Sequence, residues 1–407
     1  MAKIKPFKGL LYNSDKVDPV NVVAPPYDVI MPQGRDDYYE SSPYNVIRLI
    51  LNKSSQPYRE AGLVLNKWIE ENVLVFDSND SIYLYRQKYN YRGNSCSRYG
   101  FISLLKLESP GSDVLPHEKT YEGPKKDRFS LLEEVEANLS PIFATFSDKD
   151  RELLKIFKDI EKRAPIFSFD FEGVDHALWG ISEKESLDKI VLLMSSKSIL
   201  IADGHHRYEV ALNYRNMRHL KSQSSSEESY DYLMSYFAPI EQDGLIVLPT
   251  HRLVKLGLSE DNFKAKLSDY FEIEDFIDLE VMLAALEKLQ ILGFGVSTQS
   301  GFSLLKIRPN TKERFQKENN QLFKFDVTVL HDFILGEIFD YKGAIVYKKD
   351  EEEAVRELKE SGLDTAFFLK PIPIEHIIDV AEKKLLMPQK STYFYPKILT
   401  GLLFHKF

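Results

Sequence analysis

The chain is poor in cysteine and contains no long hydrophobic run, and each shortage excludes a class of protein. Cys96 is the only cysteine among 407 residues, so neither a disulfide framework nor a cysteine metal cage can form within one chain. We therefore expect a cytoplasmic protein. No apolar stretch approaches the roughly 20 residues of a bilayer span, and residues 1–16 do not form a signal-peptide pattern. We expect neither a membrane segment nor a signal peptide.

An excess of basic charge is also missing. Lysine and arginine number 53 against 62 aspartate and glutamate, which gives a formal net charge of −9. Acidic and basic residues are interspersed, which argues against nucleic acid as the main partner because such proteins carry a basic surface. A small anionic ligand held in a local pocket remains compatible with this balance.

Hydrophobic periodicity predicts a mixed α/β fold, because helix-like and strand-like segments alternate along much of the chain. Expected helices cover 56–72, 149–163, 325–340, 351–360 and 374–386, and two more begin at the capping boxes of Ser130 with Glu133 and of Ser182 with Glu185. Expected strands cover 82–91, 99–107, 141–146, 165–171, 177–181, 198–202, 230–240, 343–347 and 365–369. The first two pair across the loop 92–95. A second hairpin is expected at Asp243-Gly244 with 245–254, and 221–228 reads as a flexible loop.

This pattern also predicts the domain organisation. Residues 1–257 form one region, with a core at about 96–257 behind an N-terminal extension, and residues 258–407 form a smaller C-terminal α/β region. The length favours more than one domain. No repeat of fixed period is present, which argues against a solenoid.

The most informative motif is Asp203-Gly204-His205-His206-Arg207, which lies between an apolar strand and a helical pattern. Gly204 permits a tight turn. The first amides of the following helix lack intrahelical partners and form an anion site, and Arg207 can place its planar fork on the same anion. We expect phosphate to bind at this turn.

Three residues of the motif allow more than one interpretation. Asp203 either caps the helix or holds a divalent cation such as Mg²⁺ between itself and a phosphate. His205 and His206 point about 100° apart on a helix, so one is expected to face the ligand and the other the core.

A second motif is Pro116-His117-Glu118, which leads into the charged run Lys125, Lys126 and Arg128. It is not a zinc-protease HExxH motif, because Tyr121 stands at the second ligand position. Glu118 is a candidate general base, and Lys125 or Arg128 can neutralise developing charge. A solvated, irregular loop over 115–128 is the equally weighted alternative.

Two further segments are weaker signals. Two prolines make Val22–Val29 an extended wall. The run Lys390-Ser391-Thr392 lacks the glycine of a phosphate loop, because Gln389 stands before the lysine, and it is therefore not a Walker motif. Lys390 and Lys397 are candidate anion contacts. The spacing at Gly293 and Gly295 has Thr298 in place of the third glycine, so no dinucleotide fingerprint is present.

Taken together, Pro25–Val29, Pro116–Glu118, Asp203–Arg207 and Lys390–Thr392 resemble a large, mostly uncharacterised family of bacterial and archaeal proteins, and the resemblance covers nearly the whole chain. That family is similar in turn to the free serine kinases, which phosphorylate L-serine to O-phosphoserine. Those kinases share a core with the chromosome-partitioning protein ParB and with sulfiredoxin. The resemblance therefore implies a ParB/sulfiredoxin-like core.

The resemblance also implies roles for residues. Glu118 takes the proton of a primary hydroxyl. The phosphates of ATP or ADP bind at the turn, to Gly204, His205, His206 and Arg207, and Asp203 places Mg²⁺. The candidate anion contacts Lys125, Arg128 and Lys390 complete the predicted phosphate site. Positioning and charge neutralisation would then carry the phosphoryl transfer.

Two other functions compete with this kinase. One is a nucleotide-binding regulatory module of the ParB kind, although a basic recognition helix is absent. The other is metal-dependent hydrolysis through His117, His205 and His206, which the poor chelating geometry of adjacent histidines disfavours.

Overall fold

The computed structural model describes residues 2–31, 34–109, 112–222, 226–317 and 321–407. The chain folds into two compact units. Unit 1 comprises residues 1–116, 120–246 and 394–407, and unit 2 comprises residues 117–119 and 247–393. No helix within the described ranges is long and apolar enough to cross a membrane.

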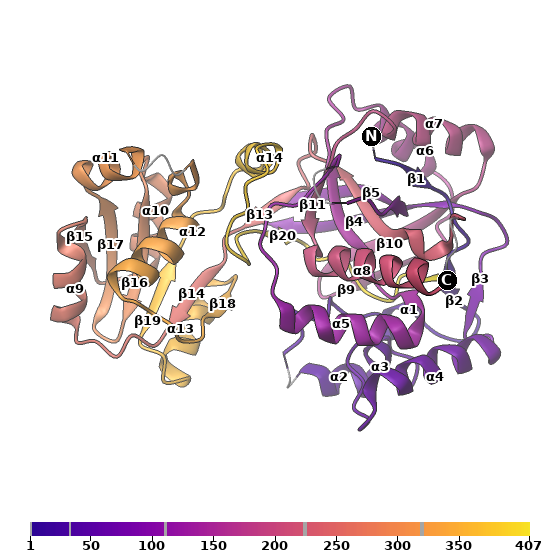
Figure 1. The fold of residues 1–407 in the computed structure, drawn as a ribbon, viewed down its shortest axis with the longest axis horizontal. Coiled ribbons are helices and arrows are strands. Elements are labelled where there is room, and N and C mark those ends of the chain that lie inside the picture. The colour runs from indigo at the N-terminus through magenta and orange to yellow at the C-terminus, as the bar shows by residue number, and fades with distance from the viewer. Residues whose placement is uncertain (1, 32–33, 110–111, 223–225, 318–320) are drawn as a thin grey trace. The chain divides into compact units, whose positions relative to one another are not determined.

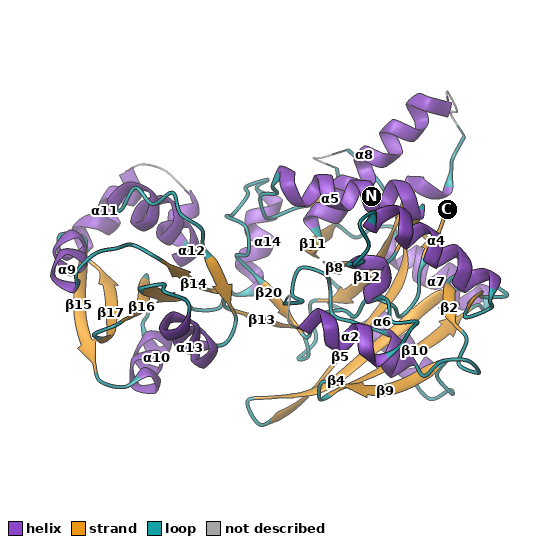
Figure 2. Ribbon diagram, turned by 90° about the horizontal axis from the view of Figure 1, so that it is seen from below, coloured by secondary structure: helices purple, strands orange, loops and turns teal. Residues whose placement is uncertain are grey.

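A large mixed sheet forms the centre of unit 1 (Figures 1 and 2). Its strand order is β6-β11-β8-β12-β5-β4-β10-β9, with β1 beside β5. The strands are β1 (Ile4–Lys5), β4 (Ile82–Tyr91), β5 (Asn94–Lys106), β6 (Val114–Leu115), β8 (Ile142–Phe146), β9 (Phe167–Phe171), β10 (Val174–Ile181), β11 (Ile199–Asp203) and β12 (Tyr232–Pro239). The β6–β11 and β8–β12 pairs are parallel, and the other pairs are antiparallel.

The helices of unit 1 are α1 (Pro19–Val22), α2 (Gly34–Ser41), α3 (Ile47–Ile50), α4 (Pro57–Glu70), α5 (Glu122–Val135), α6 (Glu152–Ile160), α7 (Lys184–Met194), α8 (His205–Ser222) and the 3-10 turn η1 (Ser229–Asp231). Two small antiparallel pairs, β2 (Leu10–Tyr12) with β3 (Leu74–Phe76) and β7 (Ala137–Asn138) with β21 (His405–Lys406), complete it. Helix α5 packs against both α4 and α8, and Figure 1 shows α5 and α8 side by side.

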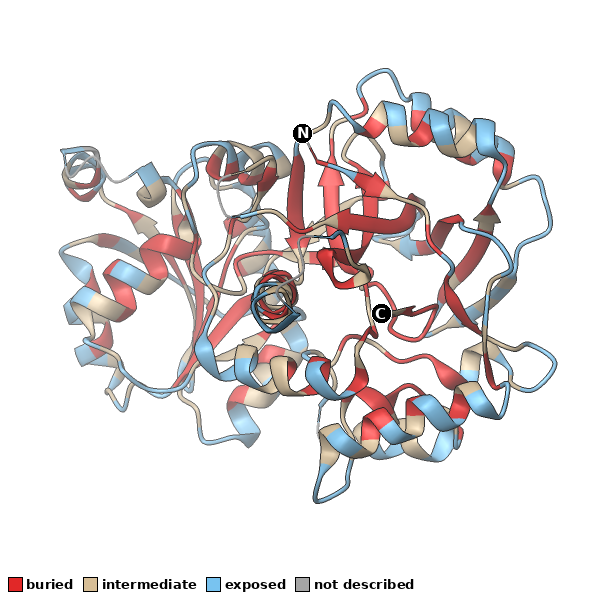
Figure 3. Cartoon of the chain, turned by 45° about the vertical axis from the view of Figure 1, so that its right-hand side comes forward, coloured by how far each residue is buried: buried red, intermediate tan, exposed pale blue. Residues whose placement is uncertain are grey.

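Three apolar clusters of described residues lie in unit 1. The largest joins the sheet to the inner faces of α6, α7 and α8, a second joins α3 and α4 to α5, and a small one joins α5 to α8. Figure 3 shows the consequence, since the central strands are buried along their length while the helices alternate buried and exposed residues. Burial of these faces is the main stabilising contribution to such a fold.

Unit 2 is built on a second antiparallel sheet, of order β15-β17-β16-β19-β14-β18. Its strands are β14 (His251–Val254), β15 (Phe271–Phe276), β16 (Gly293–Thr298), β17 (Gly301–Ile307), β18 (Val346–Lys348) and β19 (Thr365–Phe368). Its helices are α9 (Glu260–Ser268), α10 (Leu279–Lys288), α11 (Pro309–Lys317), η2 (Gln321–Lys324), α12 (Asp326–Thr328), the π-helix η3 (Val329–Ile338), α13 (Glu351–Glu360) and α14 (Ile374–Glu382). The chain passes from one unit to the other within β13 (Ile246–Leu248) and β20 (Tyr393–Tyr395), and also at both ends of the segment 117–119.

The predicted mixed α/β class is confirmed, whereas the ParB/sulfiredoxin-like core stays a prediction. The first predicted hairpin is also confirmed, because β4 and β5 pair from Tyr83↔Ile102 to Tyr91↔Asn94. Its turn is shorter than predicted. Arg92 and Gly93 both have positive φ angles, of 48° and 79°, as a two-residue hairpin turn requires.

Several local predictions are wrong. Helix α5 begins at Glu122 rather than Ser130, so residues 122–128 are helical rather than an irregular loop. Helix α7 begins at Lys184 after Glu183, with no side-chain cap. The hairpin at 243–254 is absent, because β12 pairs with β5 and β8 while β14 pairs with β18 and β19. In the predicted flexible loop, residues 223–225 lie outside the described ranges.

Candidate functional site

The predicted strand, turn and helix around Asp203 are present in unit 1. Strand β11 ends at Asp203, and α8 begins at His205. Gly204 has a φ of +95°, and a Cβ there would lie 2.8 Å from Ile142 Cγ2. Glycine is required twice over, by the backbone angle and by the close approach of β8. Tyr208 N donates to Gly204 O at 3.0 Å, the first hydrogen bond of the helix.

The Asp203 carboxylate lies between two cations. Lys397 Nζ donates to Oδ1 at 2.8 Å, and Arg207 Nη2 donates to Oδ2 at 2.9 Å. All three side chains are largely buried, with exposed fractions of 22% for Asp203, 14% for Arg207 and 11% for Lys397. The helix start is thus flanked by two positive charges that both pair with the Asp203 carboxylate.

Lys397 reaches this position because the sheet fixes the segment before it. Gln87 Nε2 of β4 donates to Lys397 O at 3.0 Å. Arg98 of β5 is fully buried and donates to the carbonyl oxygens of Tyr395, at 3.1 Å, and Pro396. Buried hydrogen bonds of a charged donor are among the strongest that a chain forms, so they hold the lysine near Asp203.

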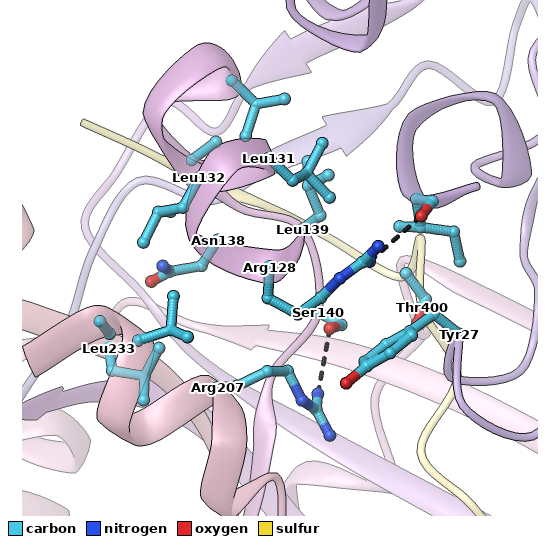
Figure 4. Close-up of a pocket in the computed structure, with 15 residues that line it drawn as sticks. Tyr27, Arg128, Leu131, Leu132, Asn138, Leu139, Ser140, Arg207, Leu233 and Thr400 are labelled. Carbon is cyan, nitrogen blue, oxygen red and sulfur yellow. Dashed lines mark hydrogen bonds between the residues drawn. The ribbon is translucent and has the colours of Figure 1, made fainter. Parts of the chain in front are cut away.

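Arg207 and Arg128, both predicted as phosphate contacts, line one pocket of unit 1 (Figure 4). Arg207 Nη1 donates to Ser140 Oγ at 3.0 Å and to Pro141 O. Arg128 Nη1 donates to Ile50 O at 3.1 Å, and its guanidinium also pairs with Asp127. The two guanidinium groups are therefore positioned by main-chain oxygens and carboxylates.

The two histidines of the motif are placed differently. His205 is buried, with an exposed fraction of 6%. His206 Nε2 lies 3.1 Å from Tyr121 N, so it accepts from the residue that precedes α5. That bond assigns the ring proton to Nδ1 in the neutral form. His206 thereby joins the first turn of α8 to the start of α5.

Lys125 of α5 lies beside Glu209, which is one turn further along α8. It donates to Glu209 at 3.1 Å and pairs with Glu122. The hydrogen bonds that it donates to Glu122 and Glu209 raise the pKa of Lys125. Thr120 Oγ1 also donates to Glu209, at 2.8 Å. Lys125 is thus held by carboxylates rather than directed at the Asp203 turn.

Glu118 and Lys390 lie together within unit 2. Glu118 Oε1 accepts from Thr392 N at 3.0 Å and from Thr392 Oγ1 at 3.1 Å, and Oε2 accepts from Lys390 N at 3.2 Å. His117 Nε2 lies 3.1 Å from Thr392 Oγ1. The two motifs predicted separately, Pro-His-Glu and Lys-Ser-Thr, therefore form one hydrogen-bonded cluster in which Glu118 fixes the loop 390–392.

Arg252 and His331 extend this cluster. Arg252 is fully buried, donates to Lys390 O at 2.7 Å and lies 3.3 Å from His331 Nε2. Burial lowers the pKa of Arg252 to about 10 and that of His331 to about 3. His331 is therefore neutral at pH 7.

The described residues contain no group of three or more histidine, cysteine, aspartate or glutamate side chains that could hold a metal ion. Both oxygens of Asp203 face cationic side chains. These contacts do not fit a resident Mg²⁺, which prefers several oxygen ligands.

Sequence reasoning did not single out Ser140, Glu209, Tyr27 or Thr400 as site residues. Ser140 and Glu209 hold Arg207 and Lys125, while Tyr27 and Thr400 line the pocket of the two arginines. For Tyr27 the sequence contained a signal, because the Pro25-Pro26-Tyr27 segment was predicted to be a rigid wall. The pairing of Ala24 with Thr400, through two main-chain hydrogen bonds of 3.1 and 2.8 Å, is a long-range contact with no local signal.

Comparisons with known proteins identify a family but assign no activity. A family model described as a protein of unknown function, DUF1015, matches residues 4–328. No curated protein matches the chain.

Three solved structures are similar to this chain at low identity. A free serine kinase in complex with AMP is 12% identical, with a TM-score of 0.36, covering 72% of this chain and 86% of the kinase. A conserved hypothetical protein from Pyrococcus furiosus is 14% identical, with a TM-score of 0.36, covering 73% and 92%. SbnI from Staphylococcus aureus, truncated at its C-terminus, is 11% identical, with a TM-score of 0.38, covering 74% and 86%. Likeness at this level carries no argument about activity.

Proposed function

The chain belongs to the DUF1015 family, and from this premise we propose that it is a nucleotide-dependent phosphotransferase that phosphorylates a small hydroxyl compound, with free L-serine as the acceptor. One observation carries the proposal: the first turn of α8 is flanked by Arg207 and Lys397, both held by Asp203. Helix N-termini with added cations bind phosphate. The resemblance of the motifs to the free serine kinases supplies the nucleotide and the acceptor.

In this proposal the phosphates of ATP or ADP bind at the start of α8. Arg207 and Lys397 each give up part of their hydrogen bonding to Asp203 and donate a hydrogen bond to a phosphate oxygen instead. Gly204 keeps the turn open to the ligand because no side chain projects there. Mg²⁺ arrives as part of the Mg–nucleotide substrate. The phosphates then replace the carboxylate as the main partner of both cations.

Glu118 is the proposed general base. It takes the proton from the serine hydroxyl while the serine oxygen bonds to the terminal phosphorus, and the bond from that phosphorus to the bridging oxygen breaks. The products are O-phosphoserine and a nucleotide with one phosphate fewer. The bonds from Lys390 N and Thr392 in the resting protein hold the carboxylate in one orientation. Oε2, which accepts from Lys390 N, has a second lone pair for the proton.

The test is phosphoserine formation by the purified protein with L-serine, Mg²⁺ and either ATP or ADP, followed by mass spectrometry. Glu118→Gln should abolish product formation while nucleotide still binds in calorimetry. Thr392→Val is the matched control, because it removes one hydroxyl contact to Glu118 and leaves the carboxylate. Product that persists in Glu118→Gln would remove Glu118 as the base.

A regulatory module that binds nucleotide without transferring phosphate is the second candidate. The engagement of Asp203 and Glu118 with protein donors favours it, since neither carboxylate needs a ligand to be satisfied. Calorimetry would distinguish the two functions. Nucleotide binding with no phosphorylated product from a panel of amino acids and other hydroxyl compounds would select the module.

A further inference from the structure

The pocket that Arg128 and Arg207 share in unit 1 has mostly apolar walls. Its cavity volume is about 70 Å³. Leucine, valine and alanine side chains of α5, α8 and the segment 137–139 form much of the lining, together with Leu233 of β12. Apolar walls of this kind favour a ligand with a hydrocarbon body.

The polar groups of the pocket are few, and each comes from a different segment. The Arg128 guanidinium is 9% exposed and lies 4.2 Å from the ring centre of Tyr27. Arg207 approaches from α8 and Ser140 from the segment before β8, and Figure 4 shows these side chains together with Tyr27. Two planar guanidinium groups in one small pocket are typical of carboxylate recognition.

Thr400 supports a polar ligand group in this pocket independently of the two arginines. It lines the pocket and is 1% exposed, and its Oγ1 has no hydrogen-bond partner within the described part of the chain. Its main chain is fixed by the two hydrogen bonds with Ala24. A buried hydroxyl without a partner is unfavourable, and a polar ligand group in the pocket would satisfy it.

The charges nearby indicate how many negative charges the ligand carries. Arg128, Arg207 and Lys397 are cationic, and Asp127 and Asp203 pair with them. The net charge of these five side chains is therefore +1. One carboxylate balances the group.

We propose that this pocket binds a small monocarboxylic acid with a branched hydrocarbon body, its carboxylate on Arg128 and Arg207 and its body against α5 and α8. Thr400 donates its hydroxyl to a carboxylate oxygen. This site requires neither nucleotide nor phosphoryl transfer, although it shares Arg207 with the proposed phosphotransferase.

Calorimetric titration of the full chain without nucleotide tests the proposal, with 4-methylpentanoate as the probe. We expect saturable binding with one site per chain. The neutral amide of the same acid lacks the charge and acetate lacks the body, so each should bind at least tenfold more weakly. Failure of 4-methylpentanoate to bind at millimolar concentration, or equal binding of the amide, would overturn the proposal.

Two variants assign the binding to this pocket. Thr400→Val keeps the side-chain shape and removes the hydroxyl, and it should weaken binding about three- to tenfold. Arg128→Lys keeps the charge and removes the planar fork, and it should weaken binding at least tenfold. Thermal unfolding checks that both variants fold. Unchanged affinity in folded Thr400→Val and Arg128→Lys would place the ligand elsewhere and contradict the proposal. Because nucleotide and serine are absent, the outcome does not depend on the phosphotransferase.

Discussion

At the scale of single residues, the Asp203 turn depends on an atom that is missing, the Cβ of Gly204. That Cβ would lie 2.8 Å from Ile142 Cγ2 and 3.0 Å from Arg207 Nη2. The second distance matters for function, because an added methyl group would push against the guanidinium that pairs with Asp203. Gly204 therefore determines both the backbone angle of the turn and the position of Arg207.

Gly204→Ala should lower the free energy of unfolding by about 2–4 kcal/mol, from the left-handed backbone and the close contacts together. Gly93→Ala is the matched control, since Gly93 also has positive φ but a Cβ there meets nothing within 4 Å. Gly93→Ala should lower the free energy of unfolding by about 1 kcal/mol. Chemical denaturation measures both, and equal losses in the two variants would contradict the crowding at Gly204.

Lys397→Met removes one of the two cations on Asp203 while keeping most of the side-chain volume. We expect about tenfold weaker nucleotide binding, because one charge-assisted hydrogen bond to phosphate is lost. The stability loss should be about 3 kcal/mol, since the ion pair is largely buried and Asp203 loses this partner. Unaltered nucleotide affinity in calorimetry would show that Lys397 serves the fold alone.

At the scale of elements, the sequence predicts best where the pattern is local. The alternation of β4 and β5, the apolar strand β11 and the periodic helix α13 are all recognisable from their own residues. The start of α5 was misplaced because Gly123-Pro124 resembles a loop. Pro124 lies in the first helical turn, where no intrahelical N–H partner is needed, so the helix tolerates it.

Contacts between distant segments could not be predicted in this way. Lys397 lies 194 positions from Asp203, and Thr392 lies 274 positions from Glu118. No local pattern encodes such pairings, because they depend on the order of strands in the sheets. The strand, turn and helix around Asp203 were therefore predictable, whereas the ion pair of Asp203 with Lys397 and the partners of Glu118 were not.

The segment 390–392 gives a test at this scale. Glu118→Ala should speed hydrogen exchange at the main-chain amides of Lys390 and Thr392, which lose their acceptor. Lys119→Ala is the control, because the hydrogen bond of Lys119 to Met387 O uses its main chain and is retained. If the amides of Lys390 and Thr392 exchange at the same rate in Glu118→Ala and in the wild type, the carboxylate does not hold this loop.

At the scale of the whole molecule, each unit contains buried histidine. Burial lowers the pKa of His176 and His405 in unit 1 and of His331 in unit 2, each to about 3. In the unfolded chain these groups titrate near 6.5. Between these values the unfolded state binds more protons, so stability falls as the pH falls from about 6.5 towards 3.

We therefore expect a lower melting temperature at pH 5.0 than at pH 7.5, with about 2 kcal/mol lost per histidine as an upper bound. Asp326 acts in the opposite sense, because burial raises its pKa to about 6 and its protonation favours the folded state below that pH. The three histidines outweigh Asp326, so we expect a net loss of stability at the lower pH. Calorimetric scanning at the two pH values measures it, and an equal or higher melting temperature at pH 5.0 would contradict the assignment.

The chain returns to unit 1 at its C-terminal end, where residues 394–407 bring Lys397 to the Asp203 turn and Thr400 to the arginine pocket. The proposed phosphotransferase and the proposed carboxylate site therefore both depend on this segment. Because the two sites share Arg207 but differ in Lys397 and Thr400, single substitutions can separate them.

The most direct test of the central claim is the transfer of phosphate from a Mg–nucleotide to L-serine by the full-length protein, measured as phosphoserine formed per enzyme molecule. We expect many turnovers with ATP or ADP for the wild type and none for Arg207→Met, which lacks the guanidinium at the start of α8. The absence of phosphoserine with both nucleotides in the wild type, or undiminished turnover in Arg207→Met, would contradict it.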